Sequence, residues 1–196
     1  MYSQHDEERA ILEHFGHTPT GLFLDIGAYD GTNLSNTKAL EELGWTGVFV
    51  ECSPSPLAQL LKTHGGKQHT IIGAAIGNGN PMMFHDSGGD AVSSLDAQHA
   101  EKWSQAASFR TMIVPTITPA MLHSMLVGLG RDKPDFVSVD IEGQSCELAI
   151  TLYDLGIRPR LWCIEKDHEW QSKIRKLLLQ GQLIHSTNEN VLIADA

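Results

Sequence analysis

The sequence has few cysteines and no long apolar run, and both shortages restrict what kind of protein it encodes. Its three cysteines, Cys52, Cys146 and Cys163, include no CxxC pair. An odd count without such spacing is typical of reduced, buried thiols in a cytosolic protein. No apolar stretch approaches the ~20 residues of a membrane-spanning helix, and residues 1–10 are polar and acidic, unlike a signal peptide. We therefore expect a soluble, cytoplasmic protein with no membrane partner.

Basic residues are also scarce. The chain has 14 Lys and Arg against 24 Asp and Glu, for a formal net charge of −10. A surface that binds duplex nucleic acid needs clustered Lys and Arg to displace phosphate counterions. The one dense basic group, Lys173, Arg175 and Lys176, has the spacing of a solvated helix face. The sequence therefore predicts no nucleic-acid partner.

Internal repeats, low-complexity tracts and long linkers are absent from the 196 residues. A hydrophobic content of 41% and a charged content of 19% are ordinary for a globular protein and exclude disorder as the default state. This length buries the core of one domain. We predict a single domain over residues 1–196, with a helical segment at residues 1–20.

Apolar strand-like segments alternate with helix-like segments along most of the chain. The predicted strands are residues 21–27, 47–51, 69–77, 135–140 and 161–165. The predicted helices carry apolar residues at helical spacing, and they are residues 33–43 with Asn33 as a possible N-cap, 54–64, 148–155 and 170–178. Two further apolar segments, residues 182–186 and 191–195, flank a TNEN turn and predict a hairpin.

Alternation of this kind, with uniformly apolar strands, indicates a parallel sheet covered by helices on both faces. We predict an α/β fold with a doubly wound, mostly parallel seven-stranded sheet and a C-terminal antiparallel hairpin. A ligand of such a sheet lies at the carboxyl ends of the strands. Residues 78–117, called the excursion below, are rich in Gly, Ser and His. We expect the excursion to pass over that end of the sheet and to shape a substrate site.

The segment DIGAYDG, residues 25–31, follows the first strand and opens the next predicted helix. Its glycines allow a sharp turn and a close approach of the backbone to a ligand. A dinucleotide fold carries GxGxxG here, but this chain has Tyr29 near the middle glycine position and acids at Asp25 and Asp30. Acids disfavour a pyrophosphate and suit a ligand with a cationic ammonium or sulfonium group.

Glu51 ends the second predicted strand, 20 residues after Gly31, where a carboxylate takes both ribose hydroxyls of a nucleotide ligand. That role is common to all adenosyl ligands, so Glu51 does not discriminate between them. Together with the acidic turn it favours S-adenosylmethionine over NAD. A Rossmann-type NAD(P)-dependent oxidoreductase remains the alternative.

Three separated motifs make the resemblance more specific. They are DIGAYDG with SNT (35–37), GWTGVFVECSP (44–54) and PDFVSVDIEG (134–143). In this order they resemble the FkbM-type family of S-adenosylmethionine-dependent methyltransferases, over residues 21 to 167. The resemblance implies a class I, Rossmann-like methyltransferase fold, S-adenosylmethionine as cofactor, and O-methylation of a small molecule, sugar or glycan.

The predicted cofactor-binding residues are those of the turn, the ribose acid and the segment AAIG (74–77) that would pass beside the adenine. They are Asp25, Gly27, Ala28, Tyr29, Asp30, Gly31, Asn36, Glu51, Cys52 and Ala75. The loop GGDAVSSL (88–95) resembles a family segment that ends in paired serines. The chain departs from the family at Ser145, where members usually carry a glutamate. That departure keeps open a cofactor-binding module without turnover.

Methyl transfer needs alignment of acceptor, methyl and sulfur, and a hydroxyl acceptor must also lose its proton. The ends of the fourth and fifth strands bring several acids together, and we predict Asp140, Glu142 and His168 as catalytic residues. Histidine suits proton transfer near neutral pH. Asp140 and Asp167 could hold Mg²⁺, but we expect Asp167 to pair with Lys166 and predict no metal site.

The excursion offers further candidates for the acceptor site. His85 and Asp86 line the acceptor pocket, or His85 is an exposed loop histidine. Trp103 and Phe109 form an acceptor platform or anchor the loop to the core. The sequence does not decide between these alternatives.

Overall fold

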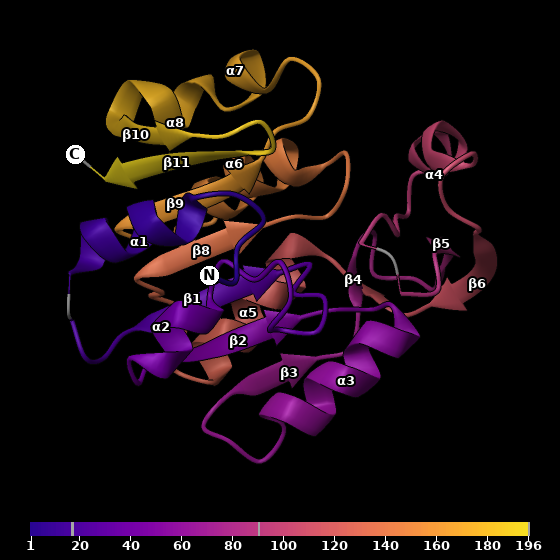
Figure 1. The fold of residues 1–196 in the computed structure, drawn as a ribbon, viewed down its shortest axis with the longest axis horizontal. Helices are drawn as coiled ribbons and strands as arrows, with labels where there is room; N and C mark the ends of the chain where they lie inside the picture. Colours follow the sequence, from indigo (N-terminus) through magenta and orange to yellow (C-terminus); the bar gives the residue numbers. More distant parts are fainter. Residues whose placement is uncertain (17, 90, 196) are drawn as a thin grey trace.

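The computed structural model describes residues 1–16, 18–89 and 91–195. Its centre is a seven-stranded sheet in the order β10-β11-β9-β8-β1-β2-β3 (Figure 1). The strands of this sheet are β1 (Leu22–Ile26), β2 (Thr46–Val50), β3 (Thr70–Ile72), β8 (Phe136–Val139), β9 (Leu161–Glu165), β10 (Gly181–Ser186) and β11 (Asn190–Asp195).

The five strands from β3 to β9 run parallel, and the pairs β9–β11 and β10–β11 are antiparallel. From β1 the sheet grows in one direction through β2 to β3, and later in the other direction through β8 to β9. The strand order therefore switches between β1 and β8, which is where ligands of open α/β sheets bind. The predicted fold class and C-terminal hairpin are confirmed.

Helices cover both faces of this sheet because successive strand residues point to opposite sides. Phe23 packs with α1 (Glu7–Phe15), α2 (Lys38–Glu42) and α3 (Pro54–His64) on one face. Leu24 packs on the other face, where the covering helices are α5 (Pro119–Gly128), α6 (Ser145–Asp154), α7 (Trp170–Lys173) and α8 (Arg175–Gln180). Both residues are fully buried.

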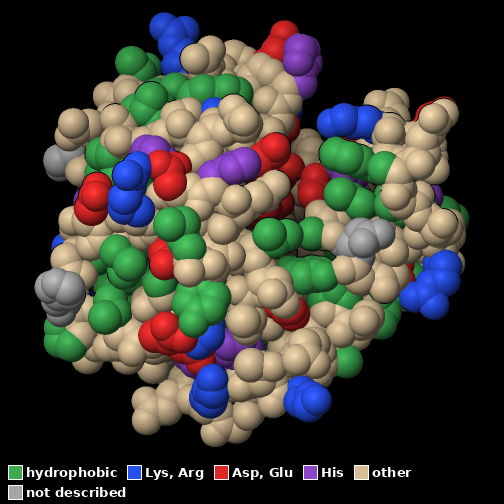
Figure 2. All heavy atoms as spheres, in the orientation of Figure 1, with side chains coloured by type: hydrophobic (Ala, Val, Ile, Leu, Met, Phe, Trp, Pro, Cys, Tyr) green, Lys and Arg blue, Asp and Glu red, His purple; other side chains and the backbone are tan. Residues whose placement is uncertain are grey.

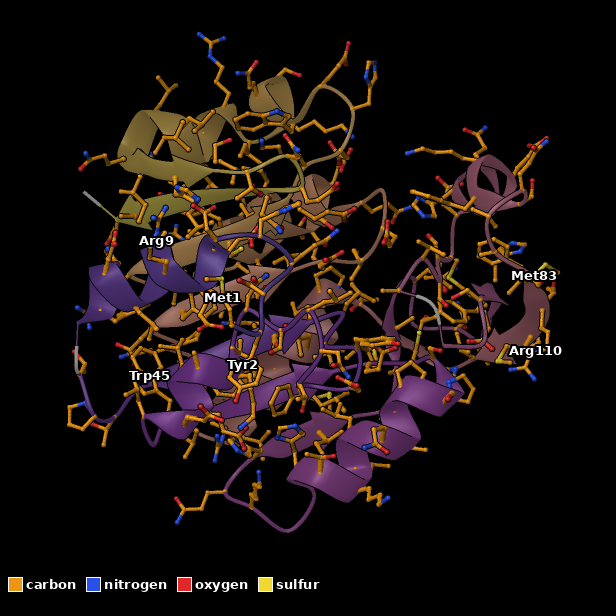
Figure 3. The ribbon with its side chains drawn as sticks, viewed as in Figure 1. Met1, Tyr2, Arg9, Trp45, Met83 and Arg110 are labelled. Carbon is orange, nitrogen blue, oxygen red and sulfur yellow. The ribbon has the colours of Figure 1, made fainter. Side chains whose placement is uncertain are left out.

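The excursion projects beyond the carboxyl ends of the parallel strands (Figure 1). It contains the antiparallel pair β5 (Met82–Asp86) and β6 (Arg110–Val114) and the short helix α4 (Ala97–Trp103). A two-residue parallel pair, β4 (Ala75–Ile76) with β7 (Thr116–Ile117), joins it to the main body. Met83 and Arg110 lie on its outer side, away from the sheet (Figure 3).

Three elements predicted from sequence differ from the structure, and one of them, the helix predicted over residues 170–178, divides at Ile174 into α7 and α8. The helix predicted over residues 33–43 is helical only over 38–42, because Leu34 takes a positive φ of 57° and the Ser35 hydroxyl accepts hydrogen bonds from Thr37 N and Lys38 N. Asn33 is therefore not the N-cap. The strand predicted over 69–77 divides in two, since the chain leaves β2 after Ile72 and then pairs with β7.

Helix α5 was not among the predicted elements. Its sequence, PAMLHSMLVG, has Leu122 and Leu126 as its fully buried positions, while Met121, Met125 and Val127 are exposed. The apolar residues thus surround the helix, and the amphipathic pattern that would predict it is weak. No helix in the described part of the chain is long and apolar enough to cross a membrane.

Candidate active site

A cleft of about 450 Å³ lies where the ends of β1, β2, β8 and β9 face the excursion. Figure 2 shows acidic side chains gathered in a hollow between the main body and the excursion. Of the ten predicted cofactor residues, eight line the cleft: Asp25, Gly27, Ala28, Tyr29, Asn36, Glu51, Cys52 and Ala75. The predicted catalytic residues Asp140, Glu142 and His168 line it as well.

The turn after β1 forms one wall of the cleft. Gly27 has a φ of 79°, and the amides of Gly27 and Ala28 both donate to Val50 O at 2.9 and 3.1 Å. A Cβ at Gly27 would lie 1.6 Å from the carbonyl oxygen of Asp140. Glycine is thus required here because the turn passes directly against the end of β8.

Asp30 and Gly31 are not brought to the cleft. The Asp30 carboxylate accepts hydrogen bonds from Thr32 N and Asn33 N at 2.9 and 2.7 Å, so it caps its own turn. At Gly31, which has a φ of 71°, a Cβ would lie 2.7 Å from His64 on α3. Both residues shape the turn from outside the cleft.

Glu51 connects the turn to the start of α3. Its Oε2 accepts from Tyr29 N at 2.8 Å, and its Oε1 accepts from Cys52 N and Ser53 N at 2.7 Å each. Burial raises the pKa of the Glu51 carboxyl, although these backbone bonds act in the opposite direction. Two carboxylate oxygens have about four acceptor positions, so one remains after these three bonds.

Asp25 and Asn36 lie deeper, at the junction of β1 and β8. The Thr37 hydroxyl donates to Asp25 Oδ2 at 2.6 Å. Burial, together with the Glu51 carboxylate, raises the pKa of Asp25 to about 7. Asn36 Nδ2 donates to Ser138 Oγ at 3.3 Å, while the buried Asn36 Oδ1 has no hydrogen-bond partner among the described residues.

Three carboxylates meet at the other half of the cleft. Oxygens of Asp140, after β8, Glu142, in the following loop, and Glu165, the last residue of β9, lie within 4.8 Å of one another. Burial and the Glu165 carboxylate raise the pKa of Asp140 well above its usual value and that of Glu142 to about 9. We call these three residues the acidic cluster.

Ser145 holds the acidic cluster in place. Its hydroxyl accepts from Ile141 N at 2.9 Å and donates to Glu165 Oε2 at 2.6 Å. Glu142 N donates to the same oxygen at 3.0 Å. The serine at the position of the family glutamate is thus fully buried and fixes the orientation of Glu165.

The excursion contributes side chains that the sequence did not single out for the site. Asp96 caps α4 by accepting a hydrogen bond from Gln98 N, and the first turn of α4 places His99 against the acidic cluster. His99 Nε2 lies 3.2 Å from Glu142 Oε2. Ser94 Oγ donates to Glu142 O at 3.0 Å, which ties the excursion to the loop after β8.

His168 lies at the mouth of the cleft, with its side chain 96% exposed. It is therefore brought near the acidic cluster by the fold but not buried with it. Two other expectations are wrong. Asp167 pairs with Lys173 at 3.0 Å and not with Lys166. Asp86 is buried against Ser53 and Arg110, so it does not line the cleft.

Glu165 and His99 are the main site residues absent from the predicted set. Glu165 had a usable signal, since it ends a predicted strand at the ligand side of the sheet. His99 had none, because the sequence does not reveal which side of the excursion faces the sheet.

Comparison with known proteins identifies the family. A family model described as the methyltransferase FkbM domain matches residues 25–174. Because the match spans most of the chain, the chain belongs to the FkbM methyltransferase family. A comparison with curated proteins found no match.

Several solved structures resemble this chain weakly and at low sequence identity. Aeropyrum pernix fibrillarin, crystallised with natively bound S-adenosyl-L-methionine, has a TM-score of 0.48 and 10% identity over 97% of this chain and 76% of that chain. Methanococcus jannaschii fibrillarin, a pre-rRNA processing protein, has a TM-score of 0.48 and 11% identity, and the match covers 91% of this chain and 68% of that chain. A putative class I S-adenosylmethionine-dependent methyltransferase from Listeria monocytogenes has a TM-score of 0.47 and 8% identity, and the match covers 99% of this chain and 61% of that chain. These scores are below 0.5, so the family assignment rests on the domain match.

Family membership makes the chain an S-adenosylmethionine-dependent methyltransferase. The prediction of enzyme class and cofactor made from the three motifs is confirmed. The nicotinamide-dependent alternative, which shared only the fold and Glu51, is not supported.

Proposed function

We propose that the protein transfers a methyl group from S-adenosylmethionine to a hydroxyl oxygen of a small molecule, sugar or glycan. The observation that carries this proposal is the division of one cleft into two halves. One half combines the turn after β1 with Glu51 and Asn36, and the other holds the acidic cluster. We assign the first half to the cofactor and the second to the acceptor.

The first half suits the groups of this cofactor. Asn36 Oδ1 is a buried acceptor without a partner among the described residues, and an ammonium donor would satisfy it. The remaining acceptor position of Glu51 faces the place of a ribose hydroxyl. Small and apolar side chains, among them Ala75, Ile76 and Phe84, line the cleft beyond Glu51 and suit a flat adenine ring.

Asp25 has a supporting part in this proposal. Its bond from Thr37 fixes the chain between the turn and α2. Tyr29 is held both by its amide, which donates to Glu51, and by its hydroxyl, which donates to Gly89 O of the excursion. These contacts set the width of the cofactor half before a ligand arrives.

When bound, S-adenosylmethionine supplies an activated methyl group on a sulfonium. The chain's own residues then have to orient a hydroxyl and accept its proton. Asp140 and Glu142 are suited to accept it, because a carboxylate with a raised pKa is a stronger base once ionised. His168 at the mouth is the third candidate, and it would reach an acceptor that extends out of the cleft.

The acceptor half favours hydroxyl-rich ligands over phosphate-rich ones. Carboxylates accept hydrogen bonds from hydroxyl groups and repel phosphates. Ser93, Ser94 and Gln144 add uncharged polar groups to the same lining. This composition supports a sugar-like or small polar acceptor.

Isothermal titration calorimetry with S-adenosylhomocysteine tests the cofactor half. We expect wild-type protein to bind it and Glu51→Ala to weaken binding by about tenfold or more, since buried partner groups lose their acceptor. Glu13→Ala, a change at an exposed position on α1, is the matched control and should bind like wild type.

Formation of S-adenosylhomocysteine in the presence of candidate acceptors tests the acceptor half. Sugars and hydroxylated small molecules should stimulate turnover, and RNA should not. A folded protein that binds no S-adenosylhomocysteine, or turnover with RNA alone, would contradict the proposal.

A further inference from the structure

The acidic cluster gathers three carboxyl groups without a Lys or Arg from the described part of the chain paired to them. Among the described residues, no Lys or Arg forms an ion pair with Asp140, Glu142 or Glu165. Lys102 is the cation that acts most on Glu142, but its ammonium lies over the Trp103 ring, 5.4 Å from the ring centroid. Three close carboxylates repel one another strongly in a partly buried site. The arrangement therefore favours a cationic ligand.

His99 gives an independent indication of what that ligand is. Its side chain is only 10% exposed, and its Nε2 lies 3.2 Å from Glu142 Oε2. The geometry is not that of a hydrogen bond, and Nε2 has no other hydrogen-bond partner among the described residues. A buried ring nitrogen that points at a carboxylate cluster in this way can share a ligand with it. Imidazole and carboxylate together are metal ligands.

The surrounding hydrogen bonds leave the cluster able to bind a cation. Ser145 Oγ and Glu142 N both donate to Glu165 Oε2, so a cation can be bound through Oε1. Ser94 fixes the backbone of Glu142 by donating to its carbonyl oxygen. Partners of this kind, which orient ligands without touching the metal, are typical of protein metal sites.

A second acid and histidine group in the protein provides a contrast. Glu41, His64 and His69 also place ligand atoms within 4.8 Å of one another. There, however, Lys38 and Lys67 form ion pairs with Glu41 at 3.0 and 2.7 Å. That carboxylate is already neutralised, and two ammonium groups would repel a metal ion.

We propose that Asp140, Glu142 and Glu165 bind a divalent cation of the Mn²⁺ type at the acceptor end of the cleft, beside the His99 imidazole that faces Glu142. Carboxylates suit Mg²⁺, Ca²⁺ and Mn²⁺, and imidazole suits transition metals, so Mn²⁺ satisfies both ligand types. This ion takes about six ligands, so positions remain beside the three carboxylates of the acidic cluster. Those positions would bind two adjacent oxygens of the acceptor, as in a vicinal diol or a hydroxy acid. This assignment of the acceptor rests on the proposed O-methyltransferase function.

Electron paramagnetic resonance of Mn²⁺ titrated into the metal-free protein tests this site, with and without S-adenosylhomocysteine. We expect one Mn²⁺ bound per chain. Glu165→Gln and His99→Ala should each weaken binding by about tenfold or more. Glu101→Gln, which alters an exposed acid on the same helix as His99, should bind Mn²⁺ like wild type.

Calorimetry with S-adenosylhomocysteine on the same variants shows that they are folded and separates this proposal from the previous one. Binding of S-adenosylhomocysteine without Mn²⁺ binding in either condition would overturn the metal site and leave the methyltransferase function intact. Mn²⁺ binding that Glu165→Gln and His99→Ala leave unchanged would also overturn it. Mn²⁺ bound at this site in a protein that methylates no hydroxyl acceptor would instead contradict the proposed acceptor class alone.

Discussion

Gly27 has the most restricted backbone position in the cleft. Its φ of 79° disfavours any residue with a Cβ, and that Cβ would meet the Asp140 carbonyl oxygen at 1.6 Å. This neighbour is backbone at the end of β8, so it cannot rotate away. The turn after β1 and the end of β8 must therefore separate if the side chain is enlarged.

Gly27→Ala should lower the free energy of unfolding by about 3 kcal/mol or more, since strain and overlap add. Gly66→Ala is the matched control. Gly66 has a φ of 81°, and a Cβ added there would have no atom within 4 Å, so the change should cost only about 1 kcal/mol. Urea denaturation measures both. Equal losses in the two variants would mean that the contact with Asp140 contributes nothing.

Asp25 makes stability depend on pH in a defined direction. Burial raises the pKa of Asp25 from an ordinary 3.8 to about 7, so the folded state binds a proton that the unfolded state releases between these values. A folded state that binds more protons loses stability as the pH rises. The contribution of Asp25 is thus fully present below pH 4 and lost by about pH 7.

Asp25→Asn removes this titration while keeping an oxygen to accept the Thr37 hydrogen bond. From pH 4 to pH 8, the free energy of unfolding of the wild type should fall relative to Asp25→Asn by up to about 4 kcal/mol. Urea titrations of both proteins at several pH values measure the difference. A constant difference across that range would show that the carboxyl does not titrate there.

At the scale of elements, the sequence predicted best those segments whose structure depends on local pattern. The apolar strands β1, β2, β8 and β9 and the hairpin β10–β11 appear within a few residues of their predicted limits. The sharp turn at Gly27 follows from glycine itself. Such features need only neighbouring residues to form.

Elements that depend on side-chain bonds or on distant partners were predicted poorly. The segment from Asn33 to Thr37 has helix-like spacing, but the Ser35 hydroxyl satisfies the amides of Thr37 and Lys38. Side chains of this type compete with the helix for backbone groups. Residues 69–77 look like one strand because periodicity does not show that Ala75 pairs with Thr116 across the excursion.

At the scale of the whole molecule, the candidate active site joins two separate parts of the chain. The strand ends of the main sheet provide Glu51, Asp140 and Glu165, and the excursion provides His99 and Trp103. Sequence reasoning found Glu51 and Asp140 because parallel strands end at one edge, but it did not select Glu165. It could not place the residues of the excursion, whose position follows from the pairing of β5 with β6 and of β4 with β7.

A substitution of Trp103 tests whether the excursion contacts the acceptor while the main sheet binds the cofactor. It ends α4, lines the cleft and is 36% exposed. Under the proposed function, Trp103→Ala should raise the KM for the acceptor by roughly tenfold, equivalent to about 1.4 kcal/mol of lost contact. The Kd for S-adenosylhomocysteine should stay within about twofold of wild type, because the cofactor half is built mainly from the sheet.

Steady-state kinetics and calorimetry measure these two quantities, with Leu179→Ala as the control. Leu179 is 73% exposed on α8, so its loss should change neither quantity. If Trp103→Ala weakened cofactor binding as much as acceptor binding, the two halves of the cleft would be coupled through the excursion. An unchanged KM would mean that Trp103 lines the cleft without contacting the acceptor.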